Sequence, residues 1–171
     1  MKNADITITP FSQDDIKFLN KLSAQRNGYF LFEEILDTSL YELNCIYGDK
    51  DIPRDSYVIG CNGKKCGIIS LKDMNTNAGS YYIQIIFDES KGGYKKIMGA
   101  ALKKIANALF LTENVSKIMS QLLPREKLIA DILTENNFKL EASLRGNYYD
   151  LGKYEDVLIF GLLKDDFKQG K

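Results

Sequence analysis

The sequence contains no histidine and no tryptophan, and only three prolines and three cysteines among its 171 residues. Without histidine, a Ser-His-Asp triad, a Cys-His pair and every zinc site that uses histidine are excluded. Any acid–base chemistry must therefore come from carboxylates, tyrosine, cysteine, lysine, water or the substrate. The three thiols, Cys45, Cys61 and Cys66, are too few and too scattered for a metal site, so we expect none.

Excess charge and long apolar runs are missing as well. The 23 basic and 23 acidic side chains cancel at neutral pH, which gives no general attraction to nucleic acid or to a membrane surface. No run approaches the roughly 18 apolar residues of a membrane helix, and Met1 to Pro10 lacks the apolar core of a signal peptide. We therefore expect a cytoplasmic protein with reduced cysteines, no nucleic-acid partner and no membrane partner.

What the sequence does contain is enough apolar material for one domain. Apolar residues make up 44% of the chain, and no repeat, linker or low-complexity segment divides residues 1–171. Hydrophobic periodicity predicts, in order, a strand, two helices, three strands, a helix, a strand, a helix and two strands. The natural packing is α/β (α+β), with one mixed, mostly antiparallel central sheet of about seven strands and helices on both faces.

The predicted boundaries follow from changes of period and from turn residues. The strands are expected near 6–9, 56–61, 64–72, 80–88, 115–123, 138–145 and 157–163, and the helices over 12–25, 30–44, 95–111 and between Pro124 and Asn136. Asn62-Gly63 predicts a two-residue hairpin turn that pairs Cys61 with Lys64 and Cys66 with Ile59. Asn136-Asn137 suits a left-handed helix stop.

Some side chains are expected in the core from their spacing. The helix over 95–111 is expected to bury one apolar face, made of Ile97, Met98, Ala101, Leu102, Ile105, Ala108 and Leu109. The next helix is expected to bury Leu128, Ile129, Ile132 and Leu133. Phe138, Leu140, Ala142 and Leu144 alternate with polar residues, which predicts a half-buried strand.

Residues 88–96, Asp-Glu-Ser-Lys-Gly-Gly-Tyr-Lys-Lys, join a predicted strand to the strongest predicted helix. Gly92 and Gly93 let backbone N–H groups turn toward one point, and the helix start adds unpaired donors and a partial positive charge. Lysines in the same segment add formal charge, so it could cradle a phosphate. The alternative is an ordinary loop with solvated lysines, since neither a Walker loop nor a Gly-x-Gly-x-x-Gly motif is present.

The element order and the C-terminal part of the chain resemble the GNAT N-acetyltransferase superfamily. The segments that carry the resemblance are Asn137-Phe138-Lys139-Leu140-Glu141, Leu144-Arg145, Tyr148 to Val157 and Gly161-Leu162-Leu163, which look like the ribosomal-protein N-acetyltransferase branch. The resemblance spans nearly the whole chain in element order, and residues 101–163 in sequence. It implies a single GNAT-like domain that holds acetyl-CoA, or another acyl-CoA, as cosubstrate in a wedge between two splayed parallel strands.

The resemblance also implies where the cosubstrate binds. The family's pyrophosphate motif, Gln/Arg-x-x-Gly-x-Gly/Ala, is degenerate here, and Lys91 to Met98 is the expected phosphate-facing stretch without a fixed register. The implied cofactor-binding residues are Ile86, Phe87, Asp88, Lys91, Gly92, Gly93, Tyr94, Lys95, Lys96, Ile97 and Met98. Backbone N–H groups near Ile86, Phe87 and Asp88 would polarise the thioester carbonyl.

The catalytic candidates are Tyr82, Gln84 and Tyr148. The tyrosine that many family members use to protonate the leaving thiolate is replaced by Leu133, and no carboxylate stands on the strand before the loop. A water held by Tyr82 or Gln84 could accept the proton of the amine. Tyr148 could line the acceptor pocket, or it could belong to a merely tyrosine-rich hairpin.

The resemblance implies an N-acetyltransferase in which a bound primary amine attacks the thioester directly, with no covalent enzyme intermediate. The acceptor would be a small-molecule or peptide amine, such as an amino sugar or a protein N-terminus. Glu33-Glu34 could attract a cationic acceptor, although a surface helix explains them equally well. The alternative is a non-catalytic GNAT-like binding or interaction module, which the altered motif favours. A homodimer stays open.

Overall fold

The computed structural model describes residues 5–23, 56–75, 79–88, 93–111, 115–150 and 152–169. In chain order the elements are β1 (Ile6–Pro10), the 3-10 turn η1 (Gln13–Asp15), α1 (Ile16–Ser23), β2 (Ser56–Cys61), β3 (Lys64–Asn75), β4 (Ser80–Phe87), α4 (Tyr94–Leu111), β5 (Lys117–Leu122), α5 (Lys127–Glu135), β6 (Lys139–Asp150), β7 (Lys153–Leu163) and α6 (Lys164–Gln169). The predicted helix over 30–44, Glu33-Glu34, Cys45, Lys91 and Gly92 lie outside the described residues.

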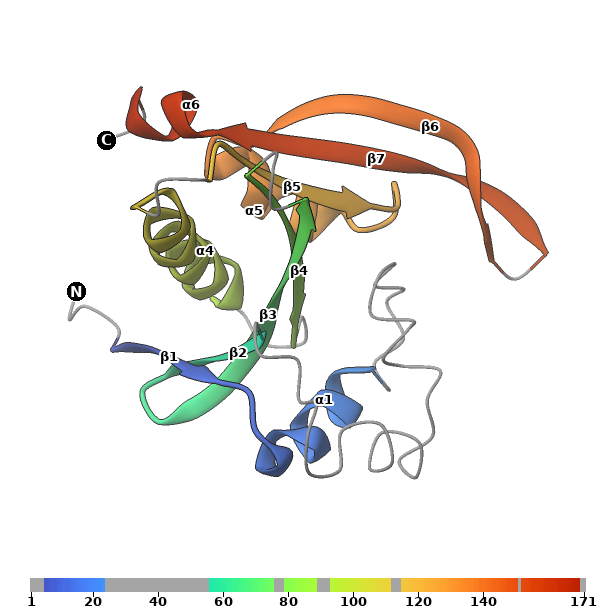
Figure 1. The fold of residues 1–171 in the computed structure, drawn as a ribbon. Coiled ribbons are helices and arrows are strands. Elements are labelled where there is room, and N and C mark those ends of the chain that lie inside the picture. The colour runs from blue at the N-terminus through green and yellow to red at the C-terminus, as the bar shows by residue number, and fades with distance from the viewer. Residues whose placement is uncertain are drawn as a thin grey trace.

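Within the described residues, seven strands form one mixed sheet in the order β1-β2-β3-β4-β5-β7-β6 (Figure 1). Neighbouring strands pair antiparallel, except that β4 and β5 run parallel. The predicted mixed, mostly antiparallel sheet is confirmed. Strand β7 pairs on both sides, as its two apolar faces predict.

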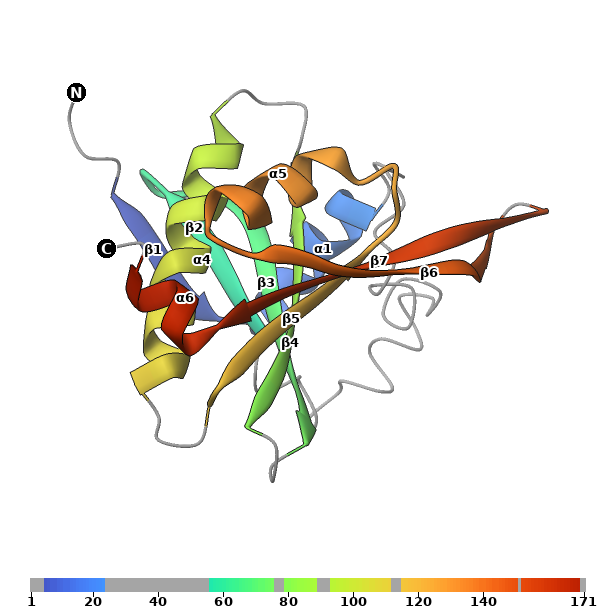
Figure 2. The same ribbon diagram turned by 90° about the horizontal axis from the view of Figure 1, so that it is seen from above.

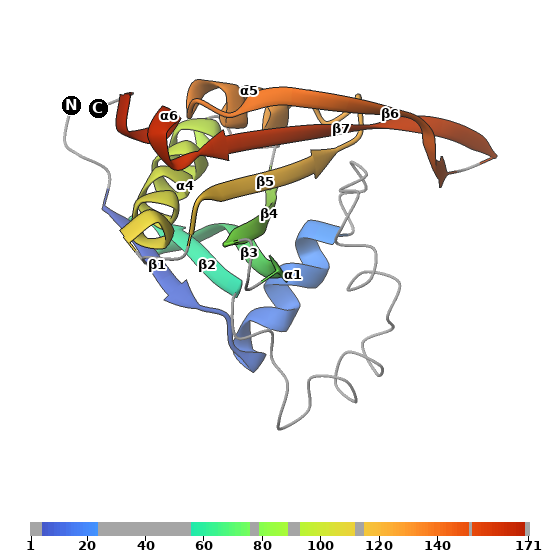
Figure 3. The same cartoon turned by 45° about the horizontal axis from the view of Figure 1, so that its top comes forward.

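Helices cover both faces of the sheet. Helix α4 packs against β1, β2 and β3 and contacts α5, whereas α1 contacts β3. Figures 2 and 3 show α1 on the side of the sheet away from α4, while α5 lies beside α4. Ile68 and Ile69, neighbours on β3 that point to opposite faces, are 1% and 0% exposed, so both faces are buried there.

The first helical turn begins after Ser12, where the predicted helix over 12–25 starts. The Ser12 N–H and hydroxyl both donate to the Asp15 carboxylate at 2.8 Å, and Lys65 of β3 forms an ion pair with Asp15 at 2.5 Å. Burial by itself would raise the pKa of Asp15, but the hydrogen bonds from Lys65 and Ser12 outweigh it and hold the pKa below 3.8. The cap thereby ties α1 to the sheet.

The β2–β3 hairpin turns at Asn62 (φ 49°) and Gly63 (φ 75°), as predicted. Cys61 pairs with Lys64, also as predicted, but the partner of Ile59 is Gly67. The expected pairing of Cys66 with Ile59 is therefore wrong, because a bulge leaves one extra residue on β3. A Cβ at position 67 would lie 2.8 Å from the Met98 sulfur, so the residue packed beneath α4 must be glycine.

The core of α4 is rotated relative to the predicted face. Its buried residues are Met98, Ala101, Leu102, Ile105, Ala106 and Phe110. The prediction for Ala108 is wrong, since that residue is exposed. Helix α6 was not expected. Its Phe167 accounts for the burial of Phe110, because the centres of the two rings lie 5.4 Å apart.

Two predictions of burial fail in the C-terminal half. Leu128 in the first turn of α5 is 38% exposed, while Leu140 and Leu144 on β6 are 56% and 38% exposed. Strand β6 lies at the sheet edge, and irregularities between Leu140 and Ala142 and between Leu144 and Tyr148 break its alternation. The expected half-buried strand is therefore a largely exposed edge strand.

Candidate functional site

Strands β4 and β5 pair over only a short part of their lengths. The paired residues are Ser80 with Lys117, Tyr81 with Ile118 and Tyr82 with Met119, although β4 continues to Phe87 and β5 to Leu122. Figure 1 shows the two strands running in different directions beyond these pairs. We call the region where residues 83–87 of β4 diverge from residues 120–122 of β5 the fork. It matches the expected pair of splayed parallel strands.

A serine side chain holds the point where the fork begins. The hydroxyl of Ser120 donates to the carbonyl oxygen of Ile83 at 2.8 Å. Both residues are buried, with exposed fractions of 1% and 0%. The hydroxyl thus supplies a donor to a β4 carbonyl that lies beyond the last backbone pair between the two strands.

The direction of the β4 backbone beyond this point follows from its pairing with β3. The Asp88 N–H donates to the Cys66 carbonyl at 3.3 Å, so Asp88 belongs to a hydrogen-bonded pair with β3. Hydrogen-bonded and non-hydrogen-bonded pairs alternate in an antiparallel ladder. The backbone groups of Ile83, Ile85 and Phe87 therefore face the fork.

This orientation refines the predicted set of carbonyl-polarising amides. The Asp88 amide is used within the sheet, and the Ile86 amide points the same way. Of the three predicted residues, Phe87 alone directs its N–H toward the fork. The Ile85 amide also faces the fork and lies nearer its beginning, but sequence reasoning missed it.

Tyr82 and Gln84, two of the predicted catalytic residues, lie on one face of β4. They stand two residues apart and are half-buried, whereas Ile83 and Ile85 between and beyond them are buried on the other face. Gln121 of β5 joins them, because its side-chain Nε2–H donates to the Tyr82 hydroxyl at 2.9 Å. A half-exposed polar face therefore borders the fork.

Tyr148, the third predicted catalytic residue, lies elsewhere. Met119, the partner of Tyr82, pairs with Gly161 on β7, whereas Tyr148 pairs with Glu155. These β7 positions are six residues apart, or ~20 Å along a strand at ~3.3 Å per residue. Figures 1 and 2 show β6 and β7 extending past the end of β5. The structure does not bring Tyr148 together with Tyr82.

The start of α4 has the backbone geometry of an anion site. Gly93 adopts φ 96°, and its carbonyl accepts the Ile97 N–H at 3.4 Å, so the N–H groups of the first turn have no acceptor within the helix. Among the described residues, a Cβ on Gly93 would meet no atom within 4 Å. The donors of this helix start suit an anion such as a phosphate.

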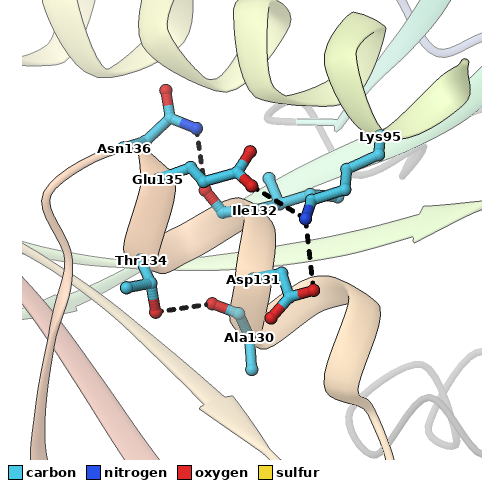
Figure 4. A network of polar contacts seen from close by, with 7 residues as sticks. All are labelled: Lys95, Ala130, Asp131, Ile132, Thr134, Glu135 and Asn136. Carbon is cyan, nitrogen blue, oxygen red and sulfur yellow. Dashed lines mark hydrogen bonds and ion pairs between the residues drawn. The ribbon is translucent and has the colours of Figure 1, made fainter.

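Lys95 does not face that opening. Its ammonium pairs with Asp131 at 3.1 Å and Glu135 at 2.8 Å, both on α5 (Figure 4). The Glu135 hydrogen bond, followed by that from Asp131, raises the pKa of Lys95 above 10.5. Lys95 therefore braces α4 against α5, and Lys96 is the exposed lysine of this turn.

The other described cofactor-binding candidates, Ile97, Met98, Asp88 and Tyr94, differ in their surroundings. Met98 is fully buried against Gly67, so its side chain belongs to the core, whereas Ile97 is half-buried. Asp88 is buried, with the Lys21 ammonium 3.7 Å from its carboxylate. Burial, then the neighbouring Cys66 and Asp88, raise the pKa of Tyr94 above 10.0, which keeps its hydroxyl protonated.

Among the residues that the structure describes, no group of three or more His, Cys, Asp or Glu side chains could hold a metal ion. No helix within the described ranges is long and apolar enough to cross a membrane.

Neither a protein-family model nor a curated protein matches the sequence. Solved structures do match. A chimera of Vibrio cholerae spermidine N-acetyltransferase SpeG and hSSAT superposes with a TM-score of 0.80 at 21% identity, covering 95% of this chain and 98% of that one. The Vibrio cholerae enzyme in complex with CoA and spermine gives 0.78, with the same identity and coverage.

The chain has the GNAT fold. A third structure, the Vibrio cholerae enzyme with manganese ions, gives a TM-score of 0.71 at 19% identity and covers 97% of this chain and 96% of that one. These are spermidine N-acetyltransferases, so the likeness to the ribosomal-protein branch stays a prediction. The fork lies between the GNAT fold's parallel strands, as the resemblance implied.

Ser120 and Gln121 were missed by sequence reasoning, although a signal for them exists. They form a polar pair inside the predicted strand over 115–123, which otherwise reads as apolar toward its end. Polar residues inside a strand next to a parallel partner need hydrogen-bond acceptors or donors nearby. That requirement would have singled them out.

Proposed function

We propose that this protein is an N-acetyltransferase that uses acetyl-CoA, or another acyl-CoA, and transfers the acyl group to a primary amine by direct attack. The observation that carries the proposal is the fork, where β4 and β5 separate after Tyr82 and Met119. The likeness to N-acetyltransferase structures along 95% of the chain supports it.

The described residues fit an acyl-CoA. The backbone of Ile85 offers hydrogen-bonding groups beside the fork, where a pantetheine arm can pair as a strand would. The open start of α4 at Gly93 offers N–H donors for the pyrophosphate. The amides that face the fork would stabilise the oxyanion formed on the thioester carbonyl.

For the acceptor we propose a polyamine. All three matched structures are spermidine N-acetyltransferases, one of them a chimera, and one is a complex with CoA and spermine. A polyamine carries the primary amine that direct attack on the thioester requires. Tyr82, Gln84 and Gln121 offer it polar contacts on the half-exposed face beside the fork. An amino sugar or a protein N-terminus would be the alternative acceptor.

Thermal unfolding with acetyl-CoA tests the cosubstrate. At 100 times its dissociation constant a ligand adds ~2.7 kcal/mol of stability, which corresponds to roughly 5–11 °C at about 2–4 °C per kcal/mol for a domain of this size. Release of CoA with spermidine, compared with an amino sugar and an N-terminal peptide, tests the acceptor. No shift at millimolar acetyl-CoA would favour the non-catalytic module instead.

Gly93→Asp places a carboxylate at the start of α4 and is expected to abolish the acetyl-CoA shift, because like charge opposes the pyrophosphate. Gly63→Asp is the matched control. Gly63 also has a positive φ and no atom within 4 Å of a Cβ, but it lies in the β2–β3 turn. Both variants carry backbone strain of about 1 kcal/mol, and only the first should lose the shift. Equal shifts would contradict the phosphate site.

A further inference from the structure

The hydrogen bond between Gln121 and Tyr82 crosses the fork where β4 and β5 separate. Tyr82 is the last β4 residue that pairs with β5, and its partner there is Met119. Gln121 lies two residues beyond Met119 on β5. The two side chains meet on the half-exposed face, at 2.9 Å between Nε2 and the hydroxyl oxygen. On the opposite face Ser120 makes the buried bond to Ile83. The face that carries Tyr82 is therefore the accessible one.

The chemistry of the two groups sets the direction of this bond. A side-chain amide nitrogen donates hydrogen bonds and cannot accept one, so the Tyr82 oxygen is the acceptor. The hydroxyl proton is not used in the bond and must point away from Gln121. Gln121 thus fixes Tyr82 as a hydrogen donor toward its surroundings.

The helix that follows the fork, α5, has no tyrosine among residues Lys127–Glu135. Leu133, at the α5 position where the resemblance implies a tyrosine in many family members, is 0% exposed and belongs to the core. A thiolate that leaves an acyl group in the fork still requires a proton. Tyr82 carries a proton-donating hydroxyl at the beginning of the fork.

We propose that Tyr82 protonates the leaving CoA sulfur and that Gln121 is its positioning residue, an inference that rests on the proposed N-acetyltransferase function. The neutral amine nitrogen forms a bond to the carbonyl carbon, and the carbon–sulfur bond then breaks with its electron pair on sulfur. The Tyr82 proton passes to that sulfur. The tyrosinate then takes one proton from the cationic nitrogen, which leaves the amide, free CoA thiol and neutral Tyr82.

Three variants test the arrangement through steady-state kinetics with acetyl-CoA and spermidine. Tyr82→Phe removes the proton and is expected to lower kcat ~100-fold or more, with KM for acetyl-CoA little changed. Gln121→Glu presents an acceptor, so Tyr82 would donate to it and turn its proton away, and kcat should fall at least ~10-fold. Gln121→Met makes no bond and leaves Tyr82 able to turn, so kcat should fall less.

The order of the two Gln121 variants separates positioning from structure. Glutamate keeps a hydrogen bond to Tyr82 and methionine does not, so a purely structural role predicts that methionine is the worse variant. The proposal predicts the reverse for kcat, and no effect of Gln121→Glu in a Tyr82→Phe background. The structural order, or an added loss in the double variant, would overturn it.

The proposed function can fail separately. If the wild type shows the acetyl-CoA shift and turnover but the variants follow the structural order, only the assignment of Gln121 and Tyr82 is lost. If the wild type neither binds acetyl-CoA nor releases CoA, both proposals are overturned. If the Tyr82→Phe variant turns over with an unchanged kcat, Tyr82 is not the proton donor, but the proposed acyltransferase function stands.

Discussion

Replacing Ser120 with alanine tests whether one side chain holds the fork where it begins. Its hydroxyl is 2.8 Å from the Ile83 carbonyl oxygen, and both residues are buried. Alanine removes that donor from a carbonyl that solvent cannot reach. A buried acceptor that loses its partner costs about 1–3 kcal/mol. At about 2–4 °C per kcal/mol for a domain of this size, the melting temperature should fall by between about 2 and 12 °C.

Urea unfolding measures the same loss as a lower midpoint with an unchanged slope. Ser143→Ala is the control, because that hydroxyl is exposed and its bond to Asp156 spans 3.3 Å. The control should change the free energy of unfolding by less than about 0.5 kcal/mol. If Ser120→Ala costs no more than the control, the carbonyl does not depend on Ser120 and the reasoning is refuted. The acetyl-CoA shift should also shrink, since the fork loses its anchor.

Three further substitutions test neighbouring claims. Asp15→Asn should lower the free energy of unfolding by about 1–3 kcal/mol at pH 7. Because the pKa of Asp15 is lowered in the folded state, this stability is present above pH 3.8 and is lost as the pH falls through the folded-state pKa. Urea unfolding should therefore show a smaller difference between variant and wild type at pH 3. Gly161→Ala puts a Cβ against the Glu141 carboxylate, which pairs with Lys117 at 2.6 Å. Loss of that partly exposed ion pair costs about 0–1 kcal/mol, whereas replacing glycine by alanine stabilises the fold by about 0.4–1 kcal/mol. A loss of more than about 2 kcal/mol in urea unfolding would therefore mean that the backbone moves. Lys95→Met should leave the acetyl-CoA shift intact because its ammonium faces α5, and a lost shift would return Lys95 to the phosphate site.

Local sequence signals predicted the seven strands, α1, α4 and α5, and several of their ends, but not α6. Asn62-Gly63 and Asn137 do take positive φ, because each position needs a residue that tolerates it. Side-chain burial was predicted less well. Leu128 and Leu140 have the right spacing for a core, but their exposure depends on what the rest of the chain places against them. Spacing identifies a face and says nothing of whether another element covers it.

The candidate site was likewise predicted only in part. The fork was expected from the resemblance, whereas the contacts that hold it join residues far apart in sequence, such as Gln121 and Tyr82. Lys95 was expected to bind phosphate because it sits in a basic loop-helix segment. Its carboxylate partners stand on α5, some 36 residues or more along the chain, where local reading cannot connect them.

The fork also explains how this fold can match at a TM-score of 0.80 while identity is only 21% and no family model matches. The groups that would face the proposed acyl-CoA are mainly main-chain amides, such as that of Ile85, which a change of side chain leaves in place. A site of this kind depends on where β4 and β5 separate more than on which residues stand on them. The side chains that matter to such a site are those that fix the separation or would supply a proton. Ser120, Gln121 and Tyr82 are the positions in this chain that meet that description.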